Sequence, residues 1–552
     1  MKSVVSFLIF YLITPAFGYS QITGTVNSPF NSIRQNSVSS MAAFGDTLWV
    51  SPKLNRLIDG ETNWYSPENA DSVINGKGRA FSMALKRDTI VAGLGFTAEN
   101  EISGPVSTGY GFYFSTDGGT SWRFSDFPLD SKPPDRCISS SEEYEQPMGV
   151  EDYDPDCDII FQYGGNMYTR TRITVPQQSV PFSTDIHGNT VFSAVWATGL
   201  LRSTDLGNSW ERVILPPSYA STLHPEGSYF WSSRFTFFNE DIQDTDTATI
   251  NRYDPLGDFN LLGFSVLIDS QDRLWYGSAA GINISENALT APIDSISWRH
   301  ISYDNSSDGL LSNWIIEIDE DPQTGTIWMT NWIAEGNNAS GFGVVSTNDG
   351  GQSFEHHLIG ERINDIDFKG DYIFAAGDNG LFISPDRGKS WIKQSRIKSP
   401  NTFIRSSARH FSLAVTTNKV WVGTSDGIAS TSDLGNSWDI IRTNFPLSGG
   451  NAYDQEAPDV ESYAYPNPFS PSTHEVVRLK FEVPKSGNVK IGIYDFGMNL
   501  VREIENNSFS PGTYEAVWDG YDSKGSKVNN APYIYIIEVP GKQINGKILV
   551  VD

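Results

Sequence analysis

The 552-residue chain has few of the residues that usually build metal or redox sites: 2 cysteines, 7 histidines and 7 methionines. It contains no Cys-x-x-Cys, His-x-x-x-His or EF-hand spacing, so no motif indicates zinc or calcium. It also lacks a nucleophile elbow and a phosphate loop, and Gly93-Leu-Gly95 lacks the rest of a dinucleotide fingerprint. We therefore expect no cofactor, and a Ca²⁺ site could come only from folded geometry.

Positive charge is also scarce. Lys and Arg number 39 against 66 Asp and Glu, which gives a net charge of −27. A chain this acidic is a poor partner for nucleic acid or for anionic membranes. The only long apolar run lies near the N-terminus and is too short to span a bilayer, so no transmembrane segment is expected.

What the chain does have is an eight-residue pattern, Ser/Thr-x-Asp-x-Gly-x-x-aromatic, that occurs five times. Asp can accept hydrogen bonds from downstream backbone N–H groups, Gly supplies unusual backbone angles, and the aromatic ring can lie over the turn. We interpret these residues as structural, each set sealing one hairpin. The pairs of Asp and aromatic residue are Asp117 and Trp122, Asp205 and Trp210, Asp349 and Phe354, Asp386 and Trp391, and Asp433 and Trp438.

Short apolar stretches before each copy predict four-stranded units, as in 410–415, 420–423, 427–430 and 438–441. Two further units, at 41–65 and 264–298, keep the strands without the full pattern. Five units plus two predict an all-β fold with seven radial sheets, a seven-bladed β-propeller; six or eight blades remain open.

The repeated pattern resembles the Asp-box, or bacterial neuraminidase (BNR) repeat. Asp-boxes occur in sialidases, sortilin-type receptors, xyloglucanases and photosystem assembly factors, nearly always within β-propellers. The resemblance implies the fold, but no single activity, because these proteins share a scaffold and not a chemistry.

The N-terminus resembles a secretion signal. Lys2 is followed by the apolar stretch 4–13 and a plausible cleavage region at 14–20, so residues 1–20 are predicted to be a signal peptide. The predicted propeller then covers 21–447, and the polar stretch 448–459 is interpreted as a linker.

Residues 460–552 contain alternating strands that predict a small β-sandwich. The block resembles the C-terminal sorting domain of the type IX secretion system, which is close to the Ig-like domain of flagellar hook-capping proteins. The residues that carry this match are Tyr465-Pro-Asn-Pro-Phe469, Ile493-Tyr-Asp495, Pro511-Gly512, Trp518-Asp-Gly520, Gly525 and the closing stretch 546–552.

That resemblance implies a partner, the outer-membrane translocon, and a location, secreted or attached to the outer surface of a bacterial cell. One departure is Asn530-Ala-Pro532, where the family commonly has Gly before a Tyr-x-Tyr strand. It leaves open whether the domain is a sorting signal or a structural module only.

Two long insertions interrupt the repeats, at about 127–185 and 216–258. We expect them on the face opposite the Asp-box turns, around the axis, where loops would carry a binding site. The first holds Cys137 and Cys157, for which a disulfide is expected outside the cell, although two free buried thiols remain an alternative. The second is rich in aromatic residues, including Trp231, which predict either a stacking platform or the core of the loop itself.

Arginines recur just before the innermost strand of several units. Guanidinium groups there could converge on a carboxylate ligand, or they could be salt-bridged surface residues. The candidates are Arg34, Arg79, Arg362 and Arg409, with Arg405 alongside. A sialidase is disfavoured, because no Arg-Ile-Pro motif occurs near the N-terminus.

Acidic residues such as Glu317, Asp319, Asp365 and Asp367 are abundant, but sequence gives no distance between them, and 317–325 is interpreted as a turn. The leading hypothesis is therefore a non-catalytic secreted propeller that binds an extracellular glycan, polymer or protein. A propeller-type glycoside hydrolase or lyase is the alternative, and an assembly factor for an envelope complex is a third.

Overall fold

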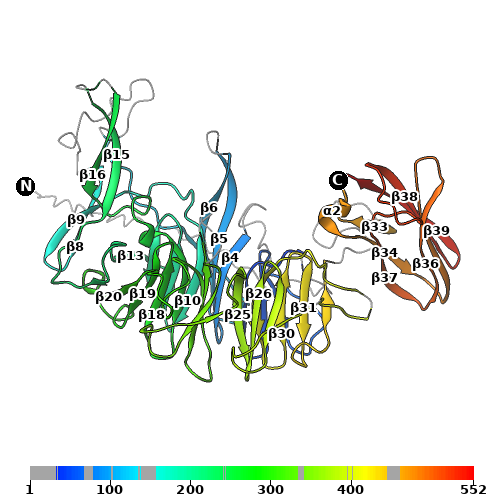
Figure 1. Cartoon of the computed structure of the whole chain (residues 1–552), viewed down its shortest axis with the longest axis horizontal. Helices are drawn as coiled ribbons and strands as arrows, with labels where there is room; N and C mark the ends of the chain where they lie inside the picture. Colours follow the sequence, from blue (N-terminus) through cyan, green and yellow to red (C-terminus); the bar gives the residue numbers. More distant parts are fainter. Residues whose placement is uncertain are drawn as a thin grey trace, which may run out of the picture.

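The computed structural model of the chain describes residues 33, 35–67, 79–100, 104–134, 137, 157–239, 242, 244–333, 341–394, 396–400, 402–443 and 460–552. The signal segment 1–20 and the linker 448–459 lie outside these ranges, as does Arg34. Almost all the regular structure is β (Figure 1).

The described part of the chain before residue 444 holds nine antiparallel sheets: two separate two-stranded hairpins, described below, and seven larger sheets built from consecutive strands. The first three are β1 (Met41–Phe44), β2 (Thr47–Val50), β3 (Asn55–Ile58); β4 (Arg79–Lys86), β5 (Thr89–Asn100), β6 (Gly104–Ser115), β7 (Arg123–Asp126); and β10 (Pro181–His187), β11 (Thr190–Val195), β12 (Gly199–Ser203), β13 (Glu211–Val213). The fourth is β17 (Gly263–Ile268), β18 (Leu274–Ser278), β19 (Gly281–Ser285), β20 (Trp298–Ile301), with β14 (Thr222–Leu223) added at its outer edge. The last three are β21 (Trp314–Glu320), β22 (Ile327–Trp332), β23 (Gly343–Thr347), β24 (Glu355–His357); β25 (Ile363–Lys369), β26 (Tyr372–Gly377), β27 (Gly380–Ser384), β28 (Ile392–Lys393); and β29 (His410–Val415), β30 (Val420–Thr424), β31 (Gly427–Thr431), β32 (Asp439–Ile441).

The innermost strands close a ring. Contacts between β1, β4, β10, β17, β21, β25 and β29 follow this order and return from β29 to β1. Apolar side chains fill the space between neighbouring sheets, for example Trp275 and Met329 between the fourth and fifth sheets. Radial sheets around an axis are a β-propeller, so the predicted all-β class and propeller fold are confirmed.

The ring is closed between the first and last sheets by packing and by a short N-terminal stretch, with no strand shared between them in the described residues. The N–H of Val38 donates to the carbonyl of Thr424 (3.0 Å), and the N–H of Gly427 donates to the carbonyl of Asn36 (2.8 Å). The rings of Trp64 and Trp421 meet edge to face at 6.2 Å. We call this junction the seam of the ring.

Each turn that carries the repeated eight-residue pattern is sealed by its own side chains. Asp205 accepts hydrogen bonds from the backbone N–H (2.9 Å) and hydroxyl (2.6 Å) of Ser209 and from the hydroxyl of Ser203 (2.8 Å). The Ser203 hydroxyl in turn accepts from the N–H of Gly207 (2.7 Å). The same four contacts recur around Asp117, Asp349, Asp386 and Asp433. Trp122, Phe354 and Trp438 are buried, whereas Trp210 and Trp391 are partly exposed.

The box glycine also brings neighbouring sheets together. Gly207 has a positive φ of 78°, and a Cβ there would lie 2.2 Å from the ring of Phe114 in the preceding sheet. At Gly119 a Cβ would lie 2.2 Å from Trp49 of the preceding sheet. The glycine is therefore required for close approach as well as for its backbone angle.

The two insertions do not surround the axis, contrary to expectation. The first contains the hairpin β8 (Ile159–Tyr163) and β9 (Asn166–Arg170); the second contains β14, the hairpin β15 (Ser232–Asn239) and β16 (Asp244–Asn251), and the short 3₁₀ helix η4 (Phe259–Leu261). Their aromatic side chains form one core with the outer strands of the third and fourth sheets, including Val213 and Trp298. Packing these aromatic side chains against the outer sheet edges removes their apolar surface from water.

Cys137 and Cys157 form a disulfide whose Cα atoms lie 5.6 Å apart. The carbonyl of Cys157 accepts a hydrogen bond from Nε of Arg172 (2.8 Å), which ties this end of the first insertion to the segment after β9.

Residues 460–552 form a two-layer sandwich. One sheet contains β33 (Ser462–Tyr465), β34 (Val477–Val483) and β37 (Gly512–Trp518), and the other contains β36 (Leu500–Phe509), β35 (Gly487–Tyr494), β38 (Ala531–Val539) and β39 (Lys542–Val550). A single helical turn, α2 (Pro471–His474), follows β33. Their facing side chains, such as Phe481, Trp518 and Ile537, form a separate core.

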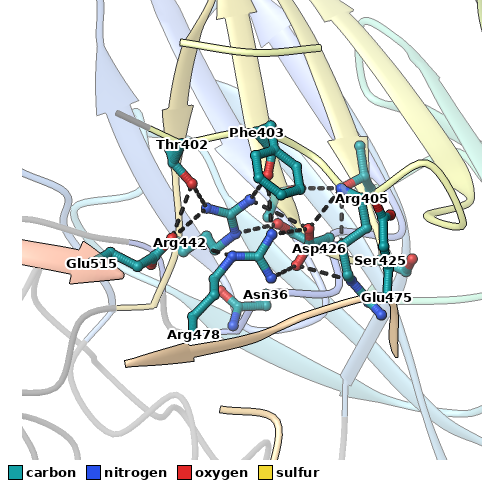
Figure 2. A network of polar contacts seen from close by, with 12 residues as sticks. Asn36, Thr402, Phe403, Arg405, Ser425, Asp426, Arg442, Glu475, Arg478 and Glu515 are labelled. Atoms are coloured by element: carbon teal, nitrogen blue, oxygen red, sulfur yellow. Dashed lines mark hydrogen bonds and ion pairs between the residues drawn. The ribbon is translucent and has the colours of Figure 1, made fainter. Parts of the chain in front are cut away.

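A buried ionic network joins this sandwich to the propeller (Figure 2). Asp426, in the turn between β30 and β31, accepts from Arg478 of β34 at 2.9 and 3.1 Å and is also paired with Arg442 (3.3 Å). Glu515 of β37 pairs with Arg478 (3.2 Å) and Arg442 (3.5 Å). Arg478 is 1% exposed, so the loss of one partner would strand a buried charge, at a cost of about 3–5 kcal/mol.

Figure 1 shows three parts rising on the same side of the ring: hairpin β15–β16, hairpin β5–β6 and the C-terminal sandwich. The turn between β5 and β6 lies at the end of the sheets where the innermost strands begin. These parts therefore flank that end of the ring, and the turns with the repeated eight-residue pattern lie at the other end.

Candidate functional site

The innermost strands share a local irregularity near their start. In six of the seven sheets a β-bulge interrupts the pairing with the second strand, leaving one extra residue. The bulged residues are Phe81, Phe182, Phe264, Ile316, Asn364 and Phe411. A bulge turns its side chain away from the regular alternation, which is how a strand can aim a side chain at a site.

The residue after the bulge usually bridges to the next sheet. The hydroxyl of Ser82 lies 3.0 Å from that of Thr184, and the N–H of Val266 donates to the hydroxyl of Ser183 (3.2 Å). Ser265 and Ser412 donate to the carbonyls of Ile315 (2.9 Å) and Val38 (3.2 Å). A small hydroxyl here therefore holds neighbouring innermost strands side by side around the axis.

Two adjacent sheets replace this serine with an acid. Glu317 of β21 and Asp365 of β25 occupy the position, and Asp319 and Asp367 follow two residues later on the same strands. Asp365 still bridges, accepting from the N–H of Leu413 (2.7 Å). Among the described residues, the Glu317 side chain makes no hydrogen bond across to β25. One wall of the axial cavity is thus acidic.

The cavity has a volume of about 390 Å³ and is lined by Glu317, Asp319, Asp365, Asp367 and Asp185 of β10, among other innermost-strand residues. We call it the channel, and its end near the bulged residues the channel mouth. Residues 317–320 therefore belong to strand β21, and the turn expected at 317–325 begins only at Asp321.

The channel acids hold their protons unusually strongly. Burial, reinforced by the charge of Asp319, raises the pKa of Glu317 to about 8. Burial raises the pKa of Asp367 to about 7, and burial with neighbouring carboxylates raises the pKa values of Asp319 and Asp365 well above the usual range. Near neutral pH Glu317 is therefore mostly protonated and Asp367 is close to half protonated, so the wall can donate as well as accept hydrogen bonds.

Aromatic side chains surround part of the channel mouth. Ring centroids of Phe81 and Phe182 lie 6.5 Å apart, those of Phe182 and Phe264 lie 6.2 Å apart, and those of Phe264 and Trp314 lie 5.1 Å apart. Trp196 packs on both Phe264 (4.9 Å) and Trp314 (6.1 Å). All five rings are at least partly exposed, and Phe182 is 39% exposed. They form a continuous apolar ledge beside the acidic wall, which we call the aromatic ledge.

Two of the predicted arginines meet at the opposite part of the channel mouth. Asp378 pairs with Arg409 (2.8 Å) and with Arg362 (3.7 Å). The Arg362 guanidinium also lies 3.8 Å from the ring centroid of Trp332. Arg79 is exposed at the start of β4 and lies over Phe81 (4.5 Å). Arg405 instead takes part in the network around Asp426.

Trp231 is not available to a ligand, which corrects its place among the candidate binding residues. It is fully buried, and its indole N–H donates to the carbonyl of Leu215 (3.1 Å). The rings of Tyr168 (5.1 Å) and Tyr253 (5.5 Å) enclose it, so it is part of the core of the insertions.

The sequence contained a signal for the aromatic ledge that the arginine pattern obscured. Four units carry the same dipeptide at the bulge: Phe81-Ser82, Phe182-Ser183, Phe264-Ser265 and Phe411-Ser412. Aligning these dipeptides would have singled out Glu317 and Asp365 as the exceptions. Trp196 and Trp314 lie outside the dipeptide and had no comparable signal.

Two further observations limit the chemistry of the described residues. They contain no group of three or more His, Cys, Asp or Glu side chains placed to hold a metal ion. None of their helices has both the length and the apolar character that crossing a membrane requires.

No protein-family model matches the chain, and no curated protein matches it. Among solved structures, it is similar to PorZ, an essential bacterial surface component of the type IX secretion system of Porphyromonas gingivalis, with 12% identity, coverage of 93% of this chain and 81% of that one, and a TM-score of 0.33. It is also similar to YCF48 from Cyanidioschyzon merolae (14% identity, 73% and 97% coverage, TM-score 0.38) and to an ancestral GH74 enzyme (13% identity, 96% and 64% coverage, TM-score 0.42). All three TM-scores are below 0.5, so the fold assignment rests on the strand pairing above.

Proposed function

We propose that the protein is a secreted or surface-attached β-propeller that binds an extracellular glycan at the channel mouth. The observation that carries this proposal is the aromatic ledge beside the acidic wall. Sugar rings offer apolar faces that pack on aromatic side chains, and hydroxyl groups that carboxyl groups bind well. A ligand lying on Trp314 and Phe264 would have its polar groups close to the channel.

Charge narrows the class of ligand. The net charge of −27 disfavours polyanions, so a neutral or amine-bearing glycan is the better match. Another extracellular polymer or a protein loop with the same pattern of apolar and hydroxyl groups would use the same surface.

The binding proposal is tested with a glycan array and by calorimetry on its best ligand. Trp314→Ala and Phe264→Ala should each weaken binding at least tenfold, because each removes part of the stacking surface. Phe496→Ala is the matched control, since Phe496 is 83% exposed on the sandwich and far from the channel residues in sequence. Equal affinity of all four proteins would contradict the proposal.

We also propose that residues 460–552 direct export through the type IX system. The closed sandwich core and the resemblance of Tyr465-Pro-Asn-Pro-Phe469 and the closing strand support this role. Deletion of 460–552 should leave the protein in the periplasm, measured by cell fractionation. Arg478→Met, which breaks the network but keeps the domain, separates loss of the signal from loss of docking. Normal export of the deleted form would contradict the proposal.

A glycoside hydrolase remains the second candidate, favoured by one observation. Glu317 is a carboxyl group that keeps its proton near neutral pH beside further carboxylates, as a general acid requires. Turnover of xyloglucan and other polysaccharides by the purified protein, abolished in Glu317→Gln, would establish this function. Binding without turnover would leave the protein a binding module.

A further inference from the structure

A second cavity lies on the outer side of the third sheet, away from the channel. Its volume is about 310 Å³, and it is lined by strand β13, hairpin β8–β9 and residues 128–130. It lies under the first insertion, and none of its lining residues lines the channel. We call it the side pocket.

Two arginines and one aspartate form its polar end. Asp130 accepts from Nη2 of Arg170 (3.1 Å) and from Nη1 of Arg212. The backbone N–H of Ile173 also donates to Asp130 (2.9 Å). The Asp130 carboxylate thus accepts three hydrogen bonds, and it fixes the orientation of both guanidinium groups.

Each guanidinium keeps a buried N–H group with no acceptor among the described residues: Nη1 of Arg170 and Nη2 of Arg212. The Arg212 side chain is only 10% exposed, and that of Arg170 is 20% exposed. Arginine stays protonated at physiological pH, and an unpaired buried donor is costly. Both side chains line the side pocket, and each carries one donor without an acceptor among the described residues.

The rest of the pocket is largely apolar. Phe161, Trp210 and Tyr253 contribute aromatic surface, and Leu129 and Ile293 contribute aliphatic surface. The Tyr253 hydroxyl is already used, since it donates to the carbonyl of Val213 (3.1 Å). A fitting ligand must combine a small anionic group with a ring or hydrocarbon body.

The polar end of the side pocket is positively charged, whereas the protein as a whole is strongly negative. Glu211 also lines the pocket, but it is paired with Arg202 (3.0 Å), so the guanidinium groups of Arg170 and Arg212 on Asp130 leave an excess of one positive charge in a chain of net charge −27. A pair of guanidinium forks held by a third group matches the planar geometry of a carboxylate, which accepts two hydrogen bonds at once.

The geometry points to the side pocket as a binding site for an organic carboxylate, bound through Arg170 and Arg212 with its ring or hydrocarbon body against Phe161 and Trp210. Two sources share this chemistry, a sugar acid and an aromatic acid. The site is independent of the proposed glycan site in the channel.

Calorimetry at pH 7 and fixed ionic strength tests it with two matched pairs: D-galacturonate against D-galactose, and benzoate against benzyl alcohol. At least one acid should bind ten times more tightly than its uncharged counterpart, and the tighter acid identifies the source. Arg212→Met and Arg170→Met should each lower that affinity at least tenfold. Arg212→Lys, which keeps the charge and loses the fork, should lower it at least threefold.

Arg362→Gln removes a guanidinium from the channel mouth and should leave carboxylate binding unchanged, as should Trp314→Ala. If an arginine variant fails to fold, chemical labelling of the wild-type protein tests the same site. Phenylglyoxal labelling read by mass spectrometry should show that the bound acid slows modification of Arg170 and Arg212, and not of Arg362. Equal binding of acids and uncharged counterparts, or equal labelling with and without acid, would overturn the inference.

Discussion

The acids at the two ends of the propeller sheets behave in opposite ways. At the turns with the repeated pattern, Asp205 accepts three hydrogen bonds from donors within its turn, and these lower its pKa despite the opposing effect of burial. In the channel, Glu317 has few donors and acidic neighbours, so burial and repulsion raise its pKa. A carboxylate with local donors stabilises the fold, whereas a carboxyl group without them stores unfavourable energy, a pattern typical of functional sites.

The strongest test of the structural role of the turns concerns the glycine. Gly207→Ala should destabilise the propeller by about 3 kcal/mol, because it combines a strained positive φ with overlap against Phe114. Gly188→Ala is the matched control, since Gly188 also has a positive φ, 59°, but nothing lies within 4 Å of the added Cβ. Urea denaturation measures both, and equal losses would show that the clash is unimportant.

Substitution of the turn aspartate Asp205 should destabilise the propeller somewhat less than substitution of Gly207. Asp205→Ala removes three acceptor contacts and should lower the free energy of unfolding by about 2 kcal/mol, at roughly 1 kcal/mol for each net hydrogen bond after solvent exposure is discounted. Asp439→Ala is the control. The Asp439 side chain is 78% exposed, and its ion pair with Lys419 is long, at 3.7 Å. A loss below 0.5 kcal/mol for Asp205→Ala would contradict the sealed-turn interpretation.

Removal of an ionisable group from the channel should stabilise the protein at high pH, whereas the substitutions at the turns destabilise it. The folded pKa of Glu317, about 8, lies above its ordinary value of 4.5, so the stability it contributes is present below about pH 4.5 and is lost as pH rises through 8. Glu317→Gln should therefore raise the melting temperature at pH 8 and change it little at pH 5.

Asp433 is the control for Glu317, because its pKa is shifted in the opposite direction and its effect on stability appears at low pH. Its pKa is lowered to about 2 by the donors of Ser437, so its contribution is present above about pH 4 and is lost as pH falls through 2. Asp433→Asn should lower the melting temperature at pH 6 and change it little below pH 2. Identical pH profiles for the two variants would remove the distinction between the two ends.

The smallest effect is expected at the arginine pair. Arg409 has a half-exposed side chain and shares Asp378 with Arg362, so Arg409→Gln should cost less than about 1 kcal/mol of stability. The double variant with Arg362→Gln should cost less than the sum of the single variants if both compete for one carboxylate. Additive costs in denaturation experiments would show that the two pairs are independent.

Much of the fold could be read from the sequence, because its signals are local. The strands expected at 410–415 and 420–423 correspond to β29 and β30, and the unit expected at 41–65 contains β1 to β3. Each turn needs only eight consecutive residues, so its pattern survives in sequence. The sandwich strands were likewise visible as alternation, apart from the short β33.

The channel could not be read in the same way. Glu317 and Asp365 lie 48 positions apart (365 − 317) and become neighbours only because successive innermost strands meet at the axis. The sequence left open whether Trp231 belongs to a stacking platform or to the core of its loop, because an aromatic insertion gives no indication of the surface that will cover it. The two buried guanidinium N–H groups of the side pocket depend on Asp130, Arg170 and Arg212, which belong to three different segments.

The seam has a mechanical consequence. At the seam the first and last sheets are joined by packing and a few hydrogen bonds, whereas at every other junction of the ring the chain also runs from one sheet to the next. The sandwich is clamped through Asp426, which lies in the last sheet. A pull applied to the C-terminus while the rest of the propeller is held would therefore load the last sheet first. The last sheet would separate from the first sheet at the seam, and the remaining sheets would stay intact.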